Sequence, residues 1–592
     1  MGYLSALPGT ACIFSGAQPM QFYARKRRTL NGMYHFQPDP LNRIGYYEHV
    51  SDAFIETVPQ KSPHNFSLKY MKKVRVPGDW NQIPGFEHYE GSAWYYTEFS
   101  ARSEAASKGK RHFLYFEGVN HKAEVYLNNE HIKSHTGAYI PFFAEVTGKL
   151  KARNGLAVRV NNIRSDRDIP ARVYDWFNFG GITRPVSLVT VPATFISGIS
   201  VRTERKKNGT FARVKVVLDG RSRSGMISVR IPGTGFSISK KPGKNGTAVL
   251  RGRIDADLWS PGNPRLYTVI AEYGEDMFKE RTGFRTVEVN KTEILLNGKP
   301  VWLRGICMHE DTPFRTTRTM TAKHAKSLLS TAKELGCNFV RLAHYPHSEL
   351  MTRTADRMGL MLWEEIPLYW SPVFSDPQVK KQSRFCLNTL IQRDCSRPSV
   401  IIWSVANETS PENDRDRIRL LKDLMDYARR LDPSRPVSFA TFGGTRGGEN
   451  EFVLTDPVCR HADIIGWNEY LGWYAGKPGE ITGSTLTVNT DKPLIITETG
   501  GGAKRGYHGT SGQRWTEEYQ EAVYKGQVKL WEKTENCRGA SPWILMDFKS
   551  PIRQNEFQRG YNRKGLVDTK LKKKKAFSVL RDFYTRMAEQ EI

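Results

Sequence analysis

Apolar and polar residues alternate over short runs in the first part of the chain. Between residues 19 and 191, Gly, Pro and Asn separate these runs, and no run shows a helical period. Strands that bury one face and expose the other alternate in this way. We therefore expect an antiparallel β-sandwich over residues 19–191, with strands at 92–100, 111–119, 122–129 and 155–162.

The same alternation continues from residue 192 to residue 287. This span is close to the roughly 100 residues of an immunoglobulin-like sandwich. Lysine and arginine are dense in it, and no group of side chains suited to catalysis is evident. We expect an immunoglobulin-like β-sandwich that acts as a spacer.

After residue 288 the pattern changes, because apolar strands now alternate with helices whose apolar residues recur about every 3.6 positions. Eight strand and helix units over about 300 residues favour a (β/α)8 TIM barrel at 288–592. The helices include 321–335, 347–358, 376–393, 515–533 and 572–587. The strands are expected at 301–309, 338–346, 360–367, 399–408, 436–444, 463–470, 493–500 and 541–548.

Length and charge narrow the class of protein. With 592 residues the chain is too long for one core, which agrees with a multidomain protein. Lys and Arg exceed Asp and Glu by 88 − 61 = 27. Such a surface attracts polyanions, so the charge leaves both nucleic acid and acidic polysaccharide open, and a demand for solubility would explain it equally well.

The first 18 residues resemble a truncated export signal. They contain an apolar run that ends in small residues, but they lack the basic start of a secretory signal. We expect export to the periplasm or the cell exterior, with a cytoplasmic location left open. The seven cysteines show no CxxC pair and no metal-type spacing, and most lie in apolar runs typical of a core.

Two glutamates end buried strands of the expected barrel. Glu408 follows the apolar run from Val400 to Val405, and Glu498 ends the strand at 493–500. Barrels keep their chemistry at the carboxyl ends of their strands, although a Glu in such a place can also be a helix cap or a surface residue. Two carboxylates about 5–5.5 Å apart suit retaining glycoside hydrolysis, and a wider gap suits inversion.

Several longer motifs, in order, resemble glycoside hydrolase family 2, and most closely its β-glucuronidases. They are YDWFNFGGITR (174–184), NFVRLAHYP (338–346), WSVANE (403–408), NEYLGWY (468–474), IITETG (495–500) and NRKG (562–565), and the likeness spans nearly all of residues 19–592. The resemblance implies that the first sandwich is a jelly-roll-like sugar-binding domain.

The resemblance assigns roles to the two glutamates and their neighbours. It implies that Glu408 is the acid/base, that Glu498 is the nucleophile and that Asn407 binds the sugar 2-hydroxyl. Glu498 should then stay ionised at mild pH beside its hydrogen-bond donors. Asp175, from the first sandwich, and His344, at the end of strand two, match positions that contact glucuronate. Asn407 as a turn residue, Asp175 as a cap of its own loop and His344 as a core histidine remain alternatives.

Three aromatic residues match further family positions. Tyr470 corresponds to a position near the nucleophile, and Tyr474 to one near the substrate carboxylate. Trp543, expected on strand eight, would form the platform on which a sugar ring stacks. Each of the three could instead belong to the apolar packing.

A carboxylate needs an amide donor and a cation, and Asn562 and Lys564 offer both. Two residues apart in extended chain, their side chains would project to the same side. In the family this pair grips the C6 carboxylate and separates glucuronidases from galactosidases. An arginine is common four residues before the Asn. Here Gln558 holds that position, so Arg559, which follows it, becomes the candidate for substrate binding.

We therefore expect a retaining exo-β-glucuronidase that releases terminal glucuronic acid from glycans or glucuronides, with an acidic carbohydrate (a uronic acid or sulfated glycan) as substrate. A β-galactosidase of the same family acting on acidic or sulfated glycans is one alternative, and a non-catalytic carbohydrate-binding protein is another. We expect no metal, cofactor, nucleic acid or membrane partner, and a homo-oligomer stays open. The glycine-rich loop at 500–512 has no assignment.

Overall fold

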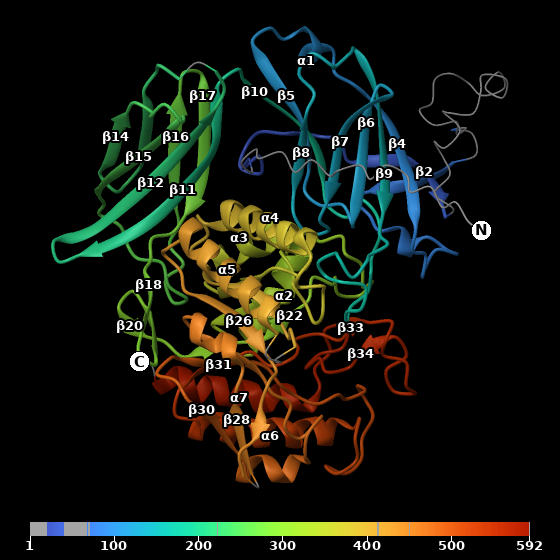
Figure 1. Ribbon diagram of the computed structural model, residues 1–592, viewed down its shortest axis with the longest axis vertical. Coiled ribbons are helices and arrows are strands. Elements are labelled where there is room, and N and C mark those ends of the chain that lie inside the picture. Colours follow the sequence, from blue (N-terminus) through green and yellow to red (C-terminus); the bar gives the residue numbers. More distant parts are fainter. Residues whose placement is uncertain are drawn as a thin grey trace. The chain divides into compact units, whose positions relative to one another are not determined.

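The computed structural model describes residues 20–40, 68, 71–221, 223–410, 414–448 and 450–590 (Figure 1). The export segment predicted at 1–18 lies outside these residues. The chain divides into two compact units. The first takes in Met1–Met20, Lys26–Ile163 and Phe179–Val191, and the second takes in Gln21–Arg25, Arg164–Asn178 and Pro192–Ile592.

The first unit contains two antiparallel sheets, with strand orders β3-β2-β4-β9-β6-β7 and β1-β10-β5-β8. Buried side chains of both sheets, such as Tyr95 and Phe116, share one apolar cluster, which confirms the predicted sandwich. The elements are β1 (Arg28–Thr29), β2 (Gly32–Asp39), β3 (Lys72–Val76), η3 (Trp80–Gln82), β4 (Ser92–Ser100), α1 (Arg102–Ala106), β5 (Lys110–Phe116), β6 (Lys122–Leu127), β7 (Glu130–Thr136), β8 (Phe142–Glu145), β9 (Arg153–Asn161) and β10 (Val186–Pro192).

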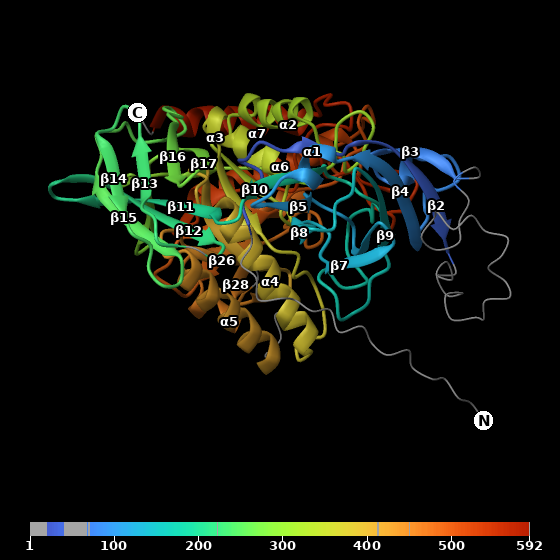
Figure 2. The ribbon, with the colours of Figure 1, turned by 90° about the horizontal axis from the view of Figure 1, so that it is seen from above.

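The second unit contains the immunoglobulin-like sandwich, whose sheets have the orders β11-β12-β15 and β14-β13-β16-β17 (Figure 2). Side chains of both sheets, such as Val214 and Val229, form its core. The strands are β11 (Phe195–Lys206), β12 (Gly209–Asp219), β13 (Ile227–Ile231), β14 (Phe236–Lys240), β15 (Thr247–Arg253), β16 (Tyr267–Tyr273) and β17 (Asp276–Thr282). A small sheet of β18 (Val287–Asn290), β19 (Glu293–Leu296) and β20 (Lys299–Pro300) follows.

A parallel sheet of order β21-β32-β31-β29-β26-β25-β24-β23-β22 forms the barrel. Its two edge strands are neighbours in sequence, separated only by Gly305 and Ile306. Gly305 N donates to Ala540 O at 2.7 Å, and Arg341 N donates to Ile306 O at 3.0 Å. One stretch of chain thus bonds to both sides and closes the barrel. The strands are β21 (Leu303–Arg304), β22 (Cys307–Met308), β23 (Phe339–Leu342), β24 (Met361–Glu365), β25 (Val400–Asn407), β26 (Val437–Thr441), β29 (Ile465–Asn468), β31 (Leu494–Glu498) and β32 (Cys537–Ala540).

The helices around the barrel begin at residues that the sequence marks as caps. Asp414 accepts hydrogen bonds from Asp416 N and Arg417 N at the start of α5. Gly359, at a φ of 68°, ends α3. The helices are α2 (Ala322–Glu334), α3 (Glu349–Met358), α4 (Pro377–Asp394), α5 (Arg415–Leu431), α6 (Glu517–Lys533) and α7 (Lys575–Gln590).

The prediction of eight strand and helix units is wrong after β26 and after β29. No α-helix follows either strand in the described residues there. Both segments, 442–462 and 471–492, are rich in Gly and other poor helix formers, which explains the difference. They form η4 (Pro457–His461), η5 (Pro478–Gly483) and a small sheet of β27 (Thr445–Arg446), β28 (Glu451–Leu454) and β30 (Thr485–Val488).

The prediction that strand eight covers residues 541–548 is also wrong. The eighth strand is β32, which ends at Ala540, so Trp543 lies beyond its carboxyl end. The strand was predicted from the apolar run WILM, because β32 itself reads CRGA and carries little apolar signal. The chain beyond it forms a short hairpin of β33 (Phe548–Lys549) and β34 (Tyr561–Asn562).

Candidate active site

Glu408 follows β25, whose residues are all buried. Its φ of 46° lies in the left-handed region that residues with a Cβ seldom adopt, and its backbone N–H donates to Ala440 O at 2.8 Å. Trp370 Nε1 donates to Glu408 Oε2 at 2.9 Å, and Asn468 Nδ2 donates to Oε1 at 3.0 Å. Two fixed donors therefore hold this carboxylate at the carboxyl end of the barrel.

Glu498 is the last residue of β31 and is only 4% exposed. Arg341 Nη1 donates to Oε1 at 3.0 Å, and the Tyr470 hydroxyl donates to Oε2 at 2.8 Å. His344 Nε2 lies 3.7 Å from Oε1. Because both oxygens are engaged, the orientation of the carboxylate is fixed.

A short chain of hydrogen bonds joins the two carboxylates. Asn468 donates to Glu408, and its Oδ1 lies 3.5 Å from Arg341 Nη1, which donates to Glu498. Burial, and then the charge of Glu408, raise the pKa of Glu498 to about 8, although Arg341 and the Tyr470 hydroxyl oppose the rise. This differs from the expectation that Glu498 stays ionised at mild pH, because burial and a second carboxylate outweigh its donors.

Arg341, on β23, is fully buried and organises the floor of this network. It donates to both oxygens of Glu365, at 3.0 and 3.2 Å, and to Asn407 Oδ1 at 2.6 Å. Burial raises the pKa of Glu365, but Arg341 and His344 outweigh it and hold that pKa at about 2. The ionised pair of Arg341 and Glu365 therefore fixes the side chains around it.

Asn407, predicted to bind the sugar 2-hydroxyl, has a free donor. Its Oδ1 accepts from Arg341 and from Asn468 Nδ2, the latter at 3.1 Å. Its Nδ2 is buried without a hydrogen-bond partner among the residues that the structure describes. A buried unpaired donor costs about 1–3 kcal/mol, so the site gains when a ligand supplies an acceptor.

His344 and Trp543 pack against each other beside the carboxylates. His344 Nδ1 is hydrogen-bonded to Glu365 Oε1 at 2.7 Å, and its ring stacks on Trp543 with centroids 4.8 Å apart. Burial lowers the pKa of His344, and the Glu365 carboxylate opposes this. His344 follows β23, and Trp543 follows β32 instead of lying on strand eight as expected. One face of Trp543 is taken by His344, so stacking on a sugar ring would need its other face or edge and stays a prediction.

A second cluster gathers Asp175, Asn562, Lys564 and Tyr474. Lys564 is 3% exposed, and its Nζ donates to the Tyr474 hydroxyl at 2.8 Å. Asn562 Nδ2 donates to Asp175 Oδ2 at 3.2 Å. Asn562 Oδ1 accepts from Lys564 N at 3.1 Å, so a local turn, and not the expected extended chain, sets the two side chains. Asp175 belongs to segment 164–178, which clusters with the barrel.

The prediction that Arg559 binds substrate is not supported by its position. Arg559 is exposed, and its Nε donates to Glu556 O at 3.1 Å. Arg553 occupies the cluster instead, since its Nε donates to both oxygens of Asp175 at 3.1 Å and its Nη1 to the Tyr474 hydroxyl at 3.4 Å. The chain between β33 and β34 folds back, so distance along the sequence does not give the position of the guanidinium.

Tyrosines connect the second cluster to the carboxylates. The rings of Tyr470 and Tyr474 lie 5.0 Å apart, and Lys564 Nζ lies 5.4 Å from the Tyr470 ring. Tyr470 in turn donates to Glu498. A cation thus lies one side chain away from a carboxylate that faces the barrel mouth.

The sequence prediction missed several residues of the site, namely Arg341, Glu365, Trp370, Asn468 and Arg553. A charged residue within an apolar barrel strand must point into the barrel and find a partner, so Arg341 in NFVRL and Glu365 in LMLWEE carried a usable signal. Trp370 and Arg553 lie on loops, and no sequence pattern marks them as site residues.

Neither a metal site nor a membrane span is found in the described part of the chain. No group of three or more His, Cys, Asp or Glu residues there is placed to hold a metal ion. No helix among these residues is long and apolar enough to cross a membrane.

Relatives named as β-glucuronidases match almost the whole chain. A "Beta-glucuronidase" of Paenibacillus borealis is 27% identical, covering 96% of this chain and 99% of the relative. A "Beta-glucuronidase" of Sus scrofa is 25% identical, covering 97% of this chain and 92% of the relative.

Solved structures give the same match in three dimensions. A β-glucuronidase of Bifidobacterium dentium complexed with coumarin-3-O-glucuronide has a TM-score of 0.82 at 26% identity, covering 96% of this chain and 98% of that one. A family 2 β-galacturonidase of Eisenbergiella tayi bound to galacturonate has a TM-score of 0.79 at 26% identity, covering 95% and 97%.

Family models match in the order that the folds suggest. "Glycosyl hydrolases family 2, sugar binding domain" matches residues 28–192, "Glycosyl hydrolases family 2" matches 194–285, and "Glycosyl hydrolases family 2, TIM barrel domain" matches 287–589. These matches cover almost the whole chain. Together with Glu408 directly after β25 and Glu498 at the end of β31, they show that the chain belongs to glycosyl hydrolases family 2 and is a glycoside hydrolase that acts on carbohydrate.

Proposed function

We propose that this protein is a retaining exo-β-glucuronidase. The observation that carries the proposal is a buried lysine without a carboxylate partner beside the two glutamates. No carboxylate pairs with Lys564 among the described residues, and its Nζ donates a hydrogen bond to the Tyr474 hydroxyl. Burying an unpaired cation is costly, so this site favours a ligand that brings its own negative charge.

The two glutamates divide the reaction between them. Glu498 attacks the anomeric carbon while Glu408 protonates the leaving oxygen, and Glu408 then activates the water that releases the sugar. Arg341 and Tyr470 orient Glu498, and Trp370 and Asn468 orient Glu408. The free Nδ2 of Asn407 suits the sugar 2-hydroxyl, an interaction that strengthens as charge develops in the transition state.

Lys564 and Arg553 share one acceptor, the Tyr474 hydroxyl, at 2.8 and 3.4 Å. A substrate carboxylate that takes the place of this hydroxyl would lie within reach of both cations. Burial raises the pKa of Tyr474, but the two cations outweigh this and lower it, which shows the positive potential at that point. We assign this cluster to the C6 carboxylate.

A second candidate is β-galacturonide hydrolysis. The cation cluster recognises a carboxylate and does not by itself separate sugars that differ at C4, and one similar structure holds galacturonate. The hydroxyl at C4 would have to be bound by other groups, and Asp175, held by Arg553 and Asn562, is the carboxylate that belongs to the cluster.

A panel of aryl β-glycosides tests these assignments. We expect wild type to hydrolyse the glucuronide faster than the galacturonide, and the galactoside least. The reverse order of the two uronides would establish the second candidate, galactoside turnover would favour a β-galactosidase, and no turnover at all would favour a binding protein.

Lys564→Ala separates charge recognition from fold. We expect kcat/KM for the glucuronide to fall about 100-fold or more, since a charge-assisted contact is worth a few kcal/mol, while any galactoside turnover stays unchanged. Arg559→Ala, which removes an exposed guanidinium outside the cluster, serves as the matched control and should behave as wild type. Equal losses on every sugar would mean that Lys564 is structural.

A further inference from the structure

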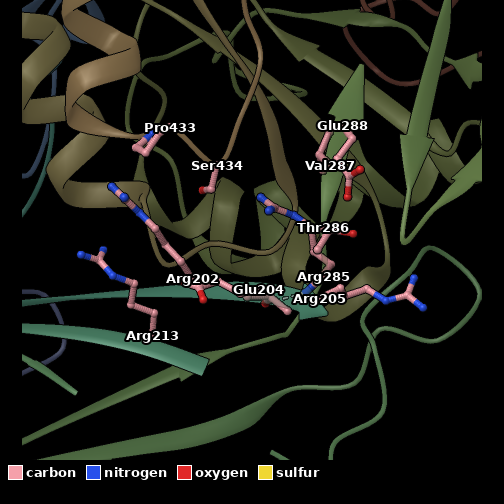
Figure 3. A pocket seen from close by; sticks show the side chains of 11 residues that line it. Arg202, Glu204, Arg205, Arg213, Arg285, Thr286, Val287, Glu288, Pro433 and Ser434 are labelled. Carbon is pink, nitrogen blue, oxygen red and sulfur yellow. Dashed lines mark hydrogen bonds between the residues drawn. The ribbon is translucent and has the colours of Figure 1, made fainter. Parts of the chain in front are cut away.

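A second basic region lies at the other end of the barrel. A cavity of about 490 Å³ opens where β11 and β12 approach the loop before β26 (Figure 3). A neighbouring cavity of about 870 Å³ shares Glu288 and Ser434 with it and extends to the segments before β29 and β31. We call the two together the basic groove. Segments that precede parallel strands lie at the amino end of the barrel, opposite Glu408 and Glu498.

The lining of the basic groove carries excess positive charge. Nine lysines and arginines and four aspartates and glutamates line the two cavities, so the difference is 9 − 4 = +5. No Phe, Tyr or Trp is among the lining residues. The groove therefore offers charge and hydrogen-bond donors, without a platform for stacking sugar rings or bases.

Arginines lie directly opposite one another across the strands of its wall. Arg202 on β11 pairs in register with Arg213 on β12, and Arg213 pairs with Arg251 on β15. Arg251 is neutralised by Glu204 at 2.7 Å, whereas Arg213 has no ion-pair partner among the described residues. Like charges opposite each other destabilise a sheet unless an anion lies between them.

At the base of the basic groove, arginines again outnumber the carboxylates that pair with them. Asp432 forms ion pairs with Arg435 Nη1 at 2.5 Å and with Arg202 Nε at 3.4 Å, so one carboxylate neutralises two guanidiniums only in part. Arg285, 6% exposed, donates to the backbone oxygens of Pro398 and Val400, at 3.1 and 2.5 Å, and has no carboxylate partner in the described chain. Burial, and then the charge of Arg435, lower the pKa of Arg285, as expected of crowded cations.

We propose that the basic groove binds carboxylate or sulfate groups of an acidic glycan chain at a non-catalytic site. The choice of a glycan over another polyanion rests on the proposed function, because the same chain hydrolyses a carbohydrate and places cations in its active site. Planar guanidiniums such as Arg202 and Arg213 grip carboxylate and sulfate oxygens in pairs. The groove would hold an acidic polymer on the enzyme while its end is cleaved elsewhere.

Equilibrium binding of labelled oligosaccharides tests this site. In a Glu498→Gln background that removes the nucleophile, fluorescence anisotropy would measure the Kd for an oligogalacturonate, a heparin oligosaccharide and a neutral dextran of equal length. We expect Arg213→Glu to weaken binding of the acidic chains about fivefold or more and to leave dextran, which should bind weakly, unchanged. Arg230→Glu is the matched control, because it makes the same charge change on β13 outside the groove, and it should change Kd less than about twofold.

Aryl glucuronide turnover is measured on the same variants without the Glu498 change. Arg213→Glu should retain wild-type kcat/KM there, which shows that the fold is intact and separates this site from the proposed function. If Arg213→Glu and Arg230→Glu changed Kd equally, or if neither changed it, the proposal that the basic groove binds the acidic chains would be overturned. An RNA oligonucleotide of matched charge that bound more tightly than either acidic glycan, and lost that binding in Arg213→Glu, would overturn the choice of ligand.

Discussion

At Glu498, burial opposes the donors that surround the carboxylate. Its oxygens accept from Arg341 and Tyr470, yet burial and the Glu408 charge raise its pKa to about 8. In the proposed reaction Glu498 attacks as the ionised carboxylate, and the nearby charge of Glu408 opposes that ionised form.

Glu408→Gln should therefore lower the pKa of Glu498. With an aryl glucuronide whose phenol leaves without protonation, kcat/KM depends on ionised Glu498 and rises with pH as that group loses its proton. Removing the charge of Glu408 removes a cause of the raised pKa, so the acid limb of the kcat/KM profile should move about one unit or more to lower pH. A limb that stays in place or moves upward would contradict the coupling.

At the scale of the elements, adjacent barrel strands carry the charged network. β23 contributes Arg341 and β24 ends at Glu365, and their parallel pairing places the two side chains within 3.0 Å. Replacing one partner of a buried ion pair leaves an uncompensated charge, which costs about 3–5 kcal/mol. The pair therefore stabilises this side of the barrel and at the same time positions Glu498 and Asn407.

Glu365→Gln should lower the midpoint of thermal unfolding and change its pH dependence. The folded pKa of about 2 lies below the roughly 4.3 of a free Glu, so Glu365 contributes about 3 kcal/mol above that value, and the contribution is lost as pH falls toward 2. Between pH 5 and 3, wild type should lose more stability than the variant. Calorimetry would measure the stability of both proteins over this pH range. Equal losses of stability in wild type and variant would show that Glu365 is not held ionised.

At the scale of the whole molecule, the charge of +27 acts on any polyanionic substrate. The field of the protein raises the local concentration of an oppositely charged chain and speeds its association. A short uncharged aglycone gains little from this field, because such a glucuronide carries a single charge. The net charge thus favours acidic polymers over small glucuronides.

Turnover of an acidic oligosaccharide should consequently depend on salt. Between about 0.01 and 0.15 M ionic strength the Debye length falls from about 30 to about 8 Å, so kcat/KM for an oligoglucuronide should fall about tenfold. The value for an aryl glucuronide should change about twofold or less over the same range. If kcat/KM depended on salt to the same degree for both substrates, the field of the protein would not be what attracts the acidic oligosaccharide.

Local pattern determined the order of folds and the two glutamates. Alternation over residues 92–100 predicts β4, and the apolar run before Glu408 predicts β25. Both strands are present, because burial of one face leaves an alternation and burial of both faces leaves an unbroken apolar run. The expected count of eight strand and helix units is not reached, because the segments after β26 and β29 are rich in poor helix formers and contain no α-helix in the described residues. β32 was missed because CRGA has almost no apolar signal.

Only the tertiary structure decided which arginine joins the cluster of Asp175, Lys564 and Tyr474. Arg559 and Arg553 are alike in sequence terms, and it is the fold of the hairpin between β33 and β34 that leaves the first exposed and brings the second to Asp175 and Tyr474. The pairing of Arg341 with Glu365 and the free Nδ2 of Asn407 are likewise products of strand register. The sequence carries the residue types and their periods, whereas contacts between distant segments depend on how the whole chain packs.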